Sequence, residues 1–548
     1  MLLLFLCGWL MQVSGFAQAP SKDSLVLVEI LKADRLGFQR KDSLTELELM
    51  AGNVAIKQGN TWFYADSMVH NKRTKIVEAF GNIHINDNDS VHTYGQYLIY
   101  RTDTKKGTLK KNVRLTDSKA TLFTEELEYE TTAKIGHYRN GGRIVTGNTV
   151  LTSREGTYFS DIKDVYFRKN VVLTDPQYKL RSDSLLYNTA SEVVTFITKT
   201  YIEDSSRNVE ASDGYYDMKN KYAYFGLRPI IRDGALTVIA NEAVTDDKTG
   251  ISKFRGDAIF VDTTQGVMVL ADYMEVNRDD NSFFATQQPL MIIKQETDSI
   301  YITADTLFSG RLSALQQKDT LLISDTAQHA MAMVNNNDDS TDRYFQGYHN
   351  VRIFSDSLQA VSDSLFYSGK DSIFQLFTNP VVWANNSQLT GDTIYLYTKN
   401  KKADRLFVFE NALAINKYGE NMFNQLRGNR LNGIFTDGVI DYMRARGNAE
   451  SIYYVTDEDS LLVGINRSSG ETIDLRWKDG ELNRVVIINE AQGTLSPPGM
   501  MSDADKTLRN FKWMDDIRPK SKFELLQSKG TPDATGKDNT QRAAIKMQ

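Results

Sequence analysis

The sequence has few of the residues that catalytic and metal-binding sites need. Its only cysteine is Cys7, and its six histidines are scattered without the spacing of a metal site. It contains no H-E-x-x-H, C-x-x-C, G-x-S-x-G, P-loop or dinucleotide-binding motif. These absences exclude the recognisable zinc, nucleophile and phosphate-cradling sites, so we expect no enzyme activity, no metal and no cofactor.

Concentrated positive charge is also missing, and prolines are few. The net charge is -6, with Lys and Arg scattered singly among acids, which argues against a nucleic-acid partner. Only nine prolines interrupt the chain, whereas 26 Tyr and 26 Phe favour strands, because aromatic side chains fit a pleated, half-buried surface. The composition therefore predicts an all-β protein.

The amino terminus carries the one long apolar run, from Leu2 to Met11, which is too short to span a bilayer. Small residues follow it, so we expect a signal peptide covering residues 1–17, cleaved before Gln18, with a cut before Pro20 as the alternative. A lipid anchor at Cys7 and a buried first strand are further alternatives. No later segment is apolar enough to cross a membrane as a helix.

Two marks repeat along the chain with a common period of about 29 residues. Repeats of this length indicate an array of similar structural units rather than several independent domains. The first mark is an Asn with a V-x-I-like pair of apolar residues close after it, and the Asn positions are Asn53, Asn82, Asn112, Asn140, Asn170, Asn350, Asn379 and Asn411. The second mark resembles A-D-S-L-x-Y, and it occurs at Asp66, Gln96, Glu125, Glu155, Asp183, Asp213, Asn241, Asp272, Asp305, Asp363 and Asp392.

Within one unit the apolar residues alternate with period two, which is the signature of strands. Val54 and Ile56 flank Ala55, for example, and the preceding Gly52-Asn53 suits a turn, since Gly and Asn tolerate positive φ. We expect each Asp of the second mark to hydrogen-bond nearby backbone amides. A catalytic carboxylate is needed once, whereas these recur in every unit, so their role is structural. The apolar face predicts either a plain core or a groove between two splayed sheets.

The wording of the marks resembles the OstA-like family, which includes the LptA-type periplasmic carriers of lipopolysaccharide. The resemblance lies in Gly52-Asn53-Val54-Ala55-Ile56, Ala65-Asp66-Ser67, Gly81-Asn82-Ile83-His84-Ile85 and Ala304-Asp305-Thr306. It is clearest from about residue 24 to 200 and recurs more loosely to about 450. It implies an elongated repeat β-jellyroll of stacked antiparallel strands in units of about 29 residues. The lipid-groove candidates that it implies are Val54, Ile56, Ile83, Ile85, Val113, Leu115, Val171, Leu173, Val351, Ile353, Val381, Trp383, Leu413 and Ile415.

The breaks in the repeat predict how the chain is organised. After the signal peptide we expect opening strands and a cap at 18–50, a first array at 51–310, a degenerate unit and loop at 311–345, a second array at 346–490, and a polar, disordered tail at 491–548. The tail contains one apolar cluster, Phe511-Lys512-Trp513-Met514.

The resemblance implies a carrier or bridge, in the periplasm or associated with the outer membrane, that shields lipopolysaccharide acyl chains. Its expected partners are lipopolysaccharide, an outer-membrane translocon barrel, an inner-membrane export complex and further copies of the chain joined end to end. One alternative is a secreted parallel β-helix that binds or acts on polysaccharide. Another is a scaffold that binds other strands at its open sheet edges.

Overall fold

The computed structural model describes residues 28–42, 45–117, 119–294, 299–315, 342–399, 402–457, 461–478 and 481–526, and most of these lie in strands. They form two compact units, one of Met1–Pro176 with Leu186–Ala190 and the other of Gln177–Leu185 with Ser191–Gln548. We call these unit 1 and unit 2. The predicted signal peptide and most of the predicted degenerate unit lie outside the described residues.

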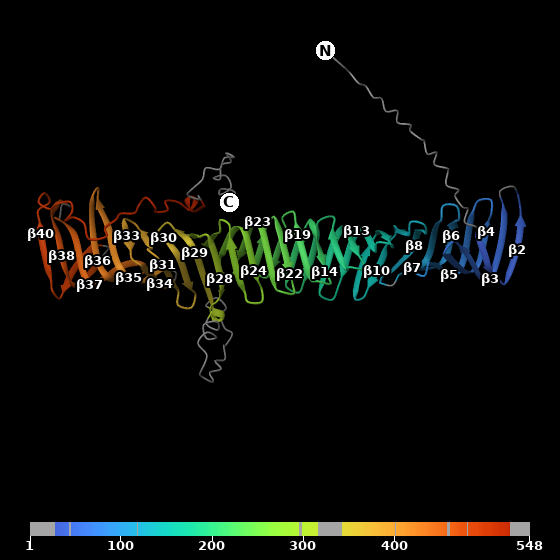
Figure 1. The fold of residues 1–548 in the computed structure, drawn as a ribbon, viewed down its shortest axis with the longest axis horizontal. Coiled ribbons are helices and arrows are strands. Elements are labelled where there is room, and N and C mark those ends of the chain that lie inside the picture. Colours follow the sequence, from blue (N-terminus) through green and yellow to red (C-terminus); the bar gives the residue numbers. More distant parts are fainter. Residues whose placement is uncertain are drawn as a thin grey trace, which may run out of the picture. The chain divides into compact units, whose positions relative to one another are not determined.

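The strands pair antiparallel throughout the described ranges, which confirms the predicted fold class and makes the parallel β-helix alternative wrong (Figure 1). None of the helices in the described residues is long and apolar enough to cross a bilayer. Unit 1 contains β1 (Glu29–Lys32), β2 (Arg35–Arg40), β3 (Glu46–Gln58), β4 (Thr61–Asn71), β5 (Ile76–Asp87), β6 (Val91–Arg101), β7 (Lys106–Thr116), β8 (Thr121–Glu130), β9 (Ile135–Tyr138), β10 (Gly142–Thr146), β11 (Thr149–Ser153), β12 (Glu155–Phe159) and β13 (Asp164–Thr174).

Residues of β14 (Tyr178–Asn188) fall in both units. Unit 2 contains β15 (Val193–Phe196), β16 (Thr200–Asp204), β17 (Arg207–Ala211), β18 (Asp213–Asp217), β19 (Tyr222–Gly226), β20 (Ile230–Asp233), β21 (Leu236–Ile239), β22 (Glu242–Asp246), β23 (Ile251–Asp262), β24 (Val267–Asn277), β25 (Ser282–Thr286), β26 (Leu290–Lys294), β27 (Ser299–Thr303), β28 (Thr306–Arg311), β29 (Arg343–Phe354), β30 (Gln359–Ser368), β31 (Ile373–Phe377), β32 (Val381–Ala384), β33 (Ser387–Thr390), β34 (Thr393–Lys399), β35 (Lys402–Gly419), β36 (Met422–Thr436), β37 (Val439–Thr456), β38 (Leu462–Lys478), β39 (Glu481–Ile488), β40 (Gln492–Ser496) and the 3-10 helix η1 (Lys522–Leu526).

The long strands are kinked at the first mark. In β5 the register with β6 shifts between Phe80 and Ile83, and Asn82 in the gap has a φ of 43°. We call this residue the kink Asn, and its equivalents at 53, 112, 170, 350, 379 and 411 also have positive φ. Asn adopts this left-handed conformation more readily than most residues, which explains why it recurs.

The two repeated marks meet at the kink. The side-chain amide of Asn82 donates to Asp66 Oδ2 at 3.0 Å, and Asn350 makes the same bond to Asp305 at 2.9 Å. The Asp carboxylate lies over Gly81, where a Cβ would collide with it. The sequence predicts a local backbone amide as the partner of this Asp. That prediction is wrong for these two repeats, because the carboxylate accepts from an Asn of a neighbouring strand instead.

In unit 1 the kinks divide the strands into two facing sheets. Phe63 is a register partner of Ile56 and Ile85 beyond the kinks, whereas Tyr100 is a partner of Val77 before one. The Phe63 and Tyr100 rings nevertheless lie 4.7 Å apart between centroids. The two sheets are thus joined by covalent backbone along the kinks, and they enclose an interior between them.

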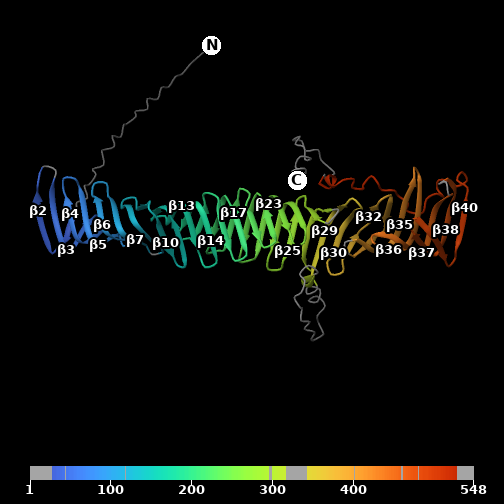
Figure 2. The ribbon, with the colours of Figure 1, turned by 180° about the vertical axis from the view of Figure 1, so that it is seen from behind.

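In unit 2 a segment without regular strands, residues 497–526, runs back over the sheet after β40. We call it the strap. Figures 1 and 2 show it in red, passing from the last strands back along β35 and β33 toward β29. The structure differs here from the expected disordered tail, because residues 491–526 are ordered against the sheet; residues 527–548 lie outside the described residues.

Buried glutamines hold the strap. Gln425 accepts from the backbone N–H of Leu508 at 2.8 Å and donates to the carbonyl of Lys506 at 2.9 Å. Gln388 repeats this pair of bonds six residues later, with Met514 N–H and Lys512 carbonyl, both at 2.7 Å. Each glutamine thus pairs with the strap backbone as a strand residue would.

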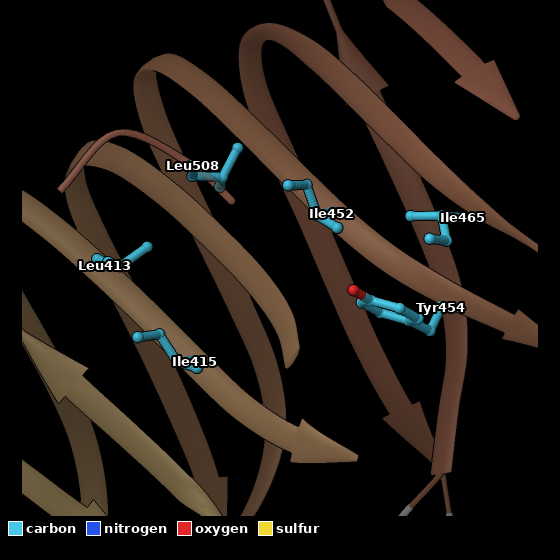
Figure 3. Packing of buried hydrophobic residues seen from close by; sticks show 6 residues of the cluster. All are labelled: Leu413, Ile415, Ile452, Tyr454, Ile465 and Leu508. Atoms are coloured by element: carbon cyan, nitrogen blue, oxygen red, sulfur yellow. The ribbon is translucent and has the colours of Figure 1, made fainter. Parts of the chain in front are cut away.

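Leucines anchor the strap at two places. Leu508 packs into a cluster with Leu413, Ile415, Ile452, Tyr454 and Ile465, as Figure 3 shows. Leu525, in η1, packs against Leu270, Leu290 and Ile292. The strap has few apolar side chains, but the sheet buries them, and this burial stabilises its position on the sheet.

Candidate lipid-binding interior

One continuous row of inward-facing residues crosses the sheet of unit 1 that contains Ile56, Phe63 and Ile85, which we call the second sheet. Directly opposed residues in antiparallel strands point to the same face. The register partners run Ile30, Ile56, Phe63, Ile85, Thr93, Leu115, Leu122, Ile144, Leu151 and Leu173. The first and third residues after each kink Asn therefore face the interior in this unit, which places Val54, Ile56, Ile83, Ile85, Val113, Leu115, Val171 and Leu173 there.

Unit 2 contains two rows with opposite orientation. Ile353 is opposed to Ala360, and its row continues through Val382, Leu389 and Ala414. The adjacent row runs Phe354, Gln359, Trp383, Gln388, Ile415, Gln425 and Ile452. The strap contacts this second row, so the second row forms the outer face and Val351 and Ile353 face inward.

The expectation that all fourteen candidates line one interior is therefore wrong for four of them. Val381, Trp383, Leu413 and Ile415 are the second and fourth residues after their kink Asn, so they lie on the strap face. A shift of one residue along a strand turns a side chain to the opposite face. All fourteen side chains are between 0 and 6% exposed, so burial alone did not separate the two groups.

The sequence analysis missed the other sheet's share of the interior. Leu98, Leu109, Leu127, Val165 and Phe167 are all fully buried in unit 1, before the kinks. The apolar alternation after the second mark would have identified Leu98 and Leu127, and the alternation before the kink Asn would have identified Leu109, Val165 and Phe167. The interior of unit 1 is thus lined from both sheets and filled by protein side chains in this structure.

The edge of unit 1 opposite the kinks is closed by side chains, and we call it the mouth. Tyr100 donates to Gln58 Oε1 at 2.6 Å, and Tyr129 donates to Asp87 Oδ2 at 3.0 Å. Tyr158 makes the equivalent bond to Asp117. These tyrosines follow one another at intervals of 29 residues, so each repeat contributes one such clasp.

The clasps are buried and electrostatically coupled. Burial raises the pKa of the Tyr100 hydroxyl to about 12, so it stays protonated as a donor at neutral pH. For Asp117 burial alone would raise the pKa, but hydrogen bonds from Tyr158, from the backbone N–H groups of Ala120 and Lys119 and from Lys163 outweigh it and lower the pKa. Asp117 is therefore an ionised acceptor at the mouth.

The remaining polar groups do not form a metal centre. Within the described ranges, no group of three or more His, Cys, Asp or Glu side chains is arranged to hold an ion. The His84 and His92 rings stack on the outer face of the second sheet, with their nitrogens 3.1 Å apart. The chemistry available in the interior is apolar contact, and the chemistry at the mouth is hydrogen bonding and charge.

Comparison with known families gives two matches in different parts of the chain. Residues 26–183 match the family described as OstA-like protein. Residues 237–402 match the family described as LptA/(LptD N-terminal domain) LPS transport protein. The predicted resemblance to OstA-like, LptA-type proteins is therefore confirmed over these two segments.

Among curated proteins, no match to this chain was found. A solved structure, that of LptH, the LptA homologous periplasmic component of the conserved lipopolysaccharide transport device from Pseudomonas aeruginosa, aligns over 26% of this chain and 81% of that chain. The aligned parts are 12% identical with a TM-score of 0.19. At that score the likeness to LptH carries no argument, and the resemblance is supported by the two family matches alone.

Proposed function

We propose that this protein is a periplasmic, non-enzymatic carrier that shields the acyl chains of lipopolysaccharide between its two sheets. The observation that supports this most directly is the row of inward-facing, mostly apolar residues, to which successive repeats contribute. The family matches support the cargo, because both describe OstA-like or lipopolysaccharide-transport proteins.

The energetics of an apolar interior suit a carrier. Each CH₂ group removed from water contributes about 0.8 kcal/mol, so acyl chains can be held without specific polar contacts. Because the same apolar surface recurs from repeat to repeat, an acyl chain has no single preferred position along it. The interior must open for this to occur, because buried side chains of the two sheets, such as Phe63 and Tyr100, are in contact across it.

The same proposal includes the partners. Lipopolysaccharide would arrive from an inner-membrane export complex and leave to an outer-membrane translocon barrel. End-to-end association of copies would use the terminal strands: β1 and β2 both pair with β3, and β39 and β40 both pair with β38.

Site-specific photo-crosslinking tests the proposal. A crosslinker at Ile56, Ile85 or Ile353 should capture lipopolysaccharide, whereas one at Lys57 or Arg114, on the outer face of the same sheet in unit 1, should not. Capture at the outward positions alone would contradict an interior site. Thermal melting of each variant would show that it is folded. If no position captures lipid and deletion of β1 and β2 abolishes partner binding, the scaffold alternative is favoured.

A further inference from the structure

One rim of the mouth of unit 1 carries a lysine in each repeat. Lys75, Lys105, Lys134 and Lys163 lie in the turns β4–β5, β6–β7, β8–β9 and β12–β13, at spacings of 30, 29 and 29 residues. The backbone N–H of Thr102 donates to the carbonyl of Lys75 at 2.9 Å, and the next three turns repeat this bond. The turns are therefore stacked in register, and we call them the lysine rim.

The residue type at these positions is not explained by the turn. The four lysines have φ values of 56, 56, 54 and 63°, in the left-handed region that favours Gly or Asn. The kinks of the long strands on the opposite edge of unit 1 place Asn in this conformation, preceded by Gly at 52 and 81 and by Lys at 111 and 169. A lysine gains nothing for the backbone here, so the recurring feature is its positive charge.

The facing rim carries carboxylates. Asp87 and Asp117 lie at the turns between β5 and β6 and between β7 and β8, and both accept the tyrosine clasps. Lys163 Nζ reaches across to Asp117 Oδ2 at 3.0 Å. Lys134 Nζ lies 2.9 Å from Asp161 in the neighbouring turn of its own rim. One ion pair, Lys163–Asp117, thus spans the mouth beside the tyrosine clasps.

We propose that the mouth of unit 1 is the lipid entrance and that the lysine rim binds the anionic head group, through its phosphates, while the acyl chains enter between the sheets. This inference rests on the proposed function. The kinked edge is closed by covalent backbone in every long strand, whereas the mouth is closed by side-chain bonds, so the sheets can part only at the mouth.

When a lipid enters, the charged groups at the mouth exchange one partner for another, and none is left unpaired. Parting the rims breaks Tyr129–Asp87, Tyr158–Asp117 and Lys163–Asp117. The carboxylates and tyrosines become solvated, and the freed lysine gains a phosphate oxygen as its acceptor. Ammonium groups bind phosphate strongly as point charges, so a row of them accepts head groups of different shape.

The test compares two pairs of lysines in the full chain. With a photo-crosslinker at Ile85, capture of purified lipopolysaccharide is measured for wild type, for Lys105→Gln/Lys134→Gln and for Lys111→Gln/Lys169→Gln. Lys111 and Lys169 also have positive φ but lie at the kinks, so the second pair changes net charge equally on the opposite edge. The rim pair should lower capture about tenfold or more, while the kink pair leaves it unchanged.

Three controls make the outcome decisive. Capture of the same lipopolysaccharide after removal of its phosphates should be equally low in wild type and the rim variant. Equal losses from both lysine pairs would overturn the rim as the site. Displacement by inorganic phosphate at the same phosphate concentration would show that free phosphate is the ligand and would overturn head-group binding. Absence of capture in wild type would instead count against the proposed function itself.

Discussion

The hydroxyl of Tyr129 donates a hydrogen bond of 3.0 Å to Oδ2 of Asp87, 42 residues earlier in the sequence. Tyr129 lies at the end of one sheet of unit 1, and Asp87 at the end of the other. The contact therefore spans the mouth at the point where the interior is separated from solvent. It is repeated in type by Tyr100 with Gln58 and by Tyr158 with Asp117.

Tyr129→Phe should destabilise unit 1 by about 1.5–3 kcal/mol, the range for hydrogen bonds to charged groups. The ring and its packing are kept, but buried Asp87 loses one of its donors and retains Thr61. Urea unfolding followed by circular dichroism measures the change. Tyr64→Phe, on the outer face, should change the free energy of unfolding by less than about 0.5 kcal/mol. Equal effects would show that the clasp contributes nothing specific.

Stability should fall in acid through Asp117. Its pKa is lowered in the folded protein, so its contribution is fully present above the pKa of the unfolded chain, about 4, and is lost as pH falls toward the folded value. The free energy of unfolding of wild type should therefore decline below about pH 4. Asp117→Asn should be less stable at pH 7 and should show a shallower decline over the same acid range. A decline of equal slope in both proteins would contradict this assignment.

Gly81→Ala should be more damaging than an alanine at an equivalent backbone conformation. Gly81 has a φ of 72°, and a Cβ there would collide with the Asp66 carboxylate. Gly147 has a φ of 55° with open space around it. Gly147→Ala should cost about 1–2 kcal/mol for the left-handed conformation alone, and Gly81→Ala about 1–3 kcal/mol more. Thermal unfolding of the two variants gives the comparison, and equal losses would show that Asp66 moves aside freely.

The repeat itself made much of the fold predictable. The strands and the shared face of Val54 and Ile56 follow from local periodicity, which acts over a few residues, whereas the antiparallel pairing was implied by the family resemblance. The positive φ of Asn53 follows from turn chemistry, but the predicted turn is wrong, because Gly52-Asn53 kinks β3 without ending it. The partner of Asp66 was not predictable in the same way, because Asn82 belongs to the next repeat and backbone N–H groups were equally plausible donors from sequence alone.

The strap explains the largest difference from the sequence analysis. After Asn379 and Asn411 both faces of the strand are apolar. The sequence pattern then does not show which face points into the interior. The outward face is apolar because Leu508, 93 positions after Ile415, covers it. A contact of that separation leaves no local signal in the sequence.

A photo-crosslinker at Ile415 should capture the strap rather than lipid. Ile415 packs in the cluster that contains Leu508, on the face opposite to the inward row of Ile353. Mass spectrometry of the digested protein should therefore show an internal crosslink to a peptide within 497–526. The same crosslinker at Ile353 should give no such peptide. A lipid adduct at Ile415 would place that residue in the interior and contradict the register argument.

Leu508→Ala should release the strap without unfolding the sheets. Leu508 is 3% exposed, and removing a buried leucine side chain costs about 2–5 kcal/mol, because contacts are lost and a cavity remains. That cost falls on a segment held elsewhere by the two glutamines, by Leu525, by the bond from Arg518 to Gln359 and by packing of Phe511 and Trp513. Limited proteolysis should therefore cleave 497–526 at least tenfold faster in the variant, while the strand content measured by circular dichroism stays unchanged. Leu495→Ala, in β40 and 58% exposed, is the matched control and should cleave as wild type does. Equal cleavage rates for Leu508→Ala and wild type would show that this anchor does not hold the strap in place.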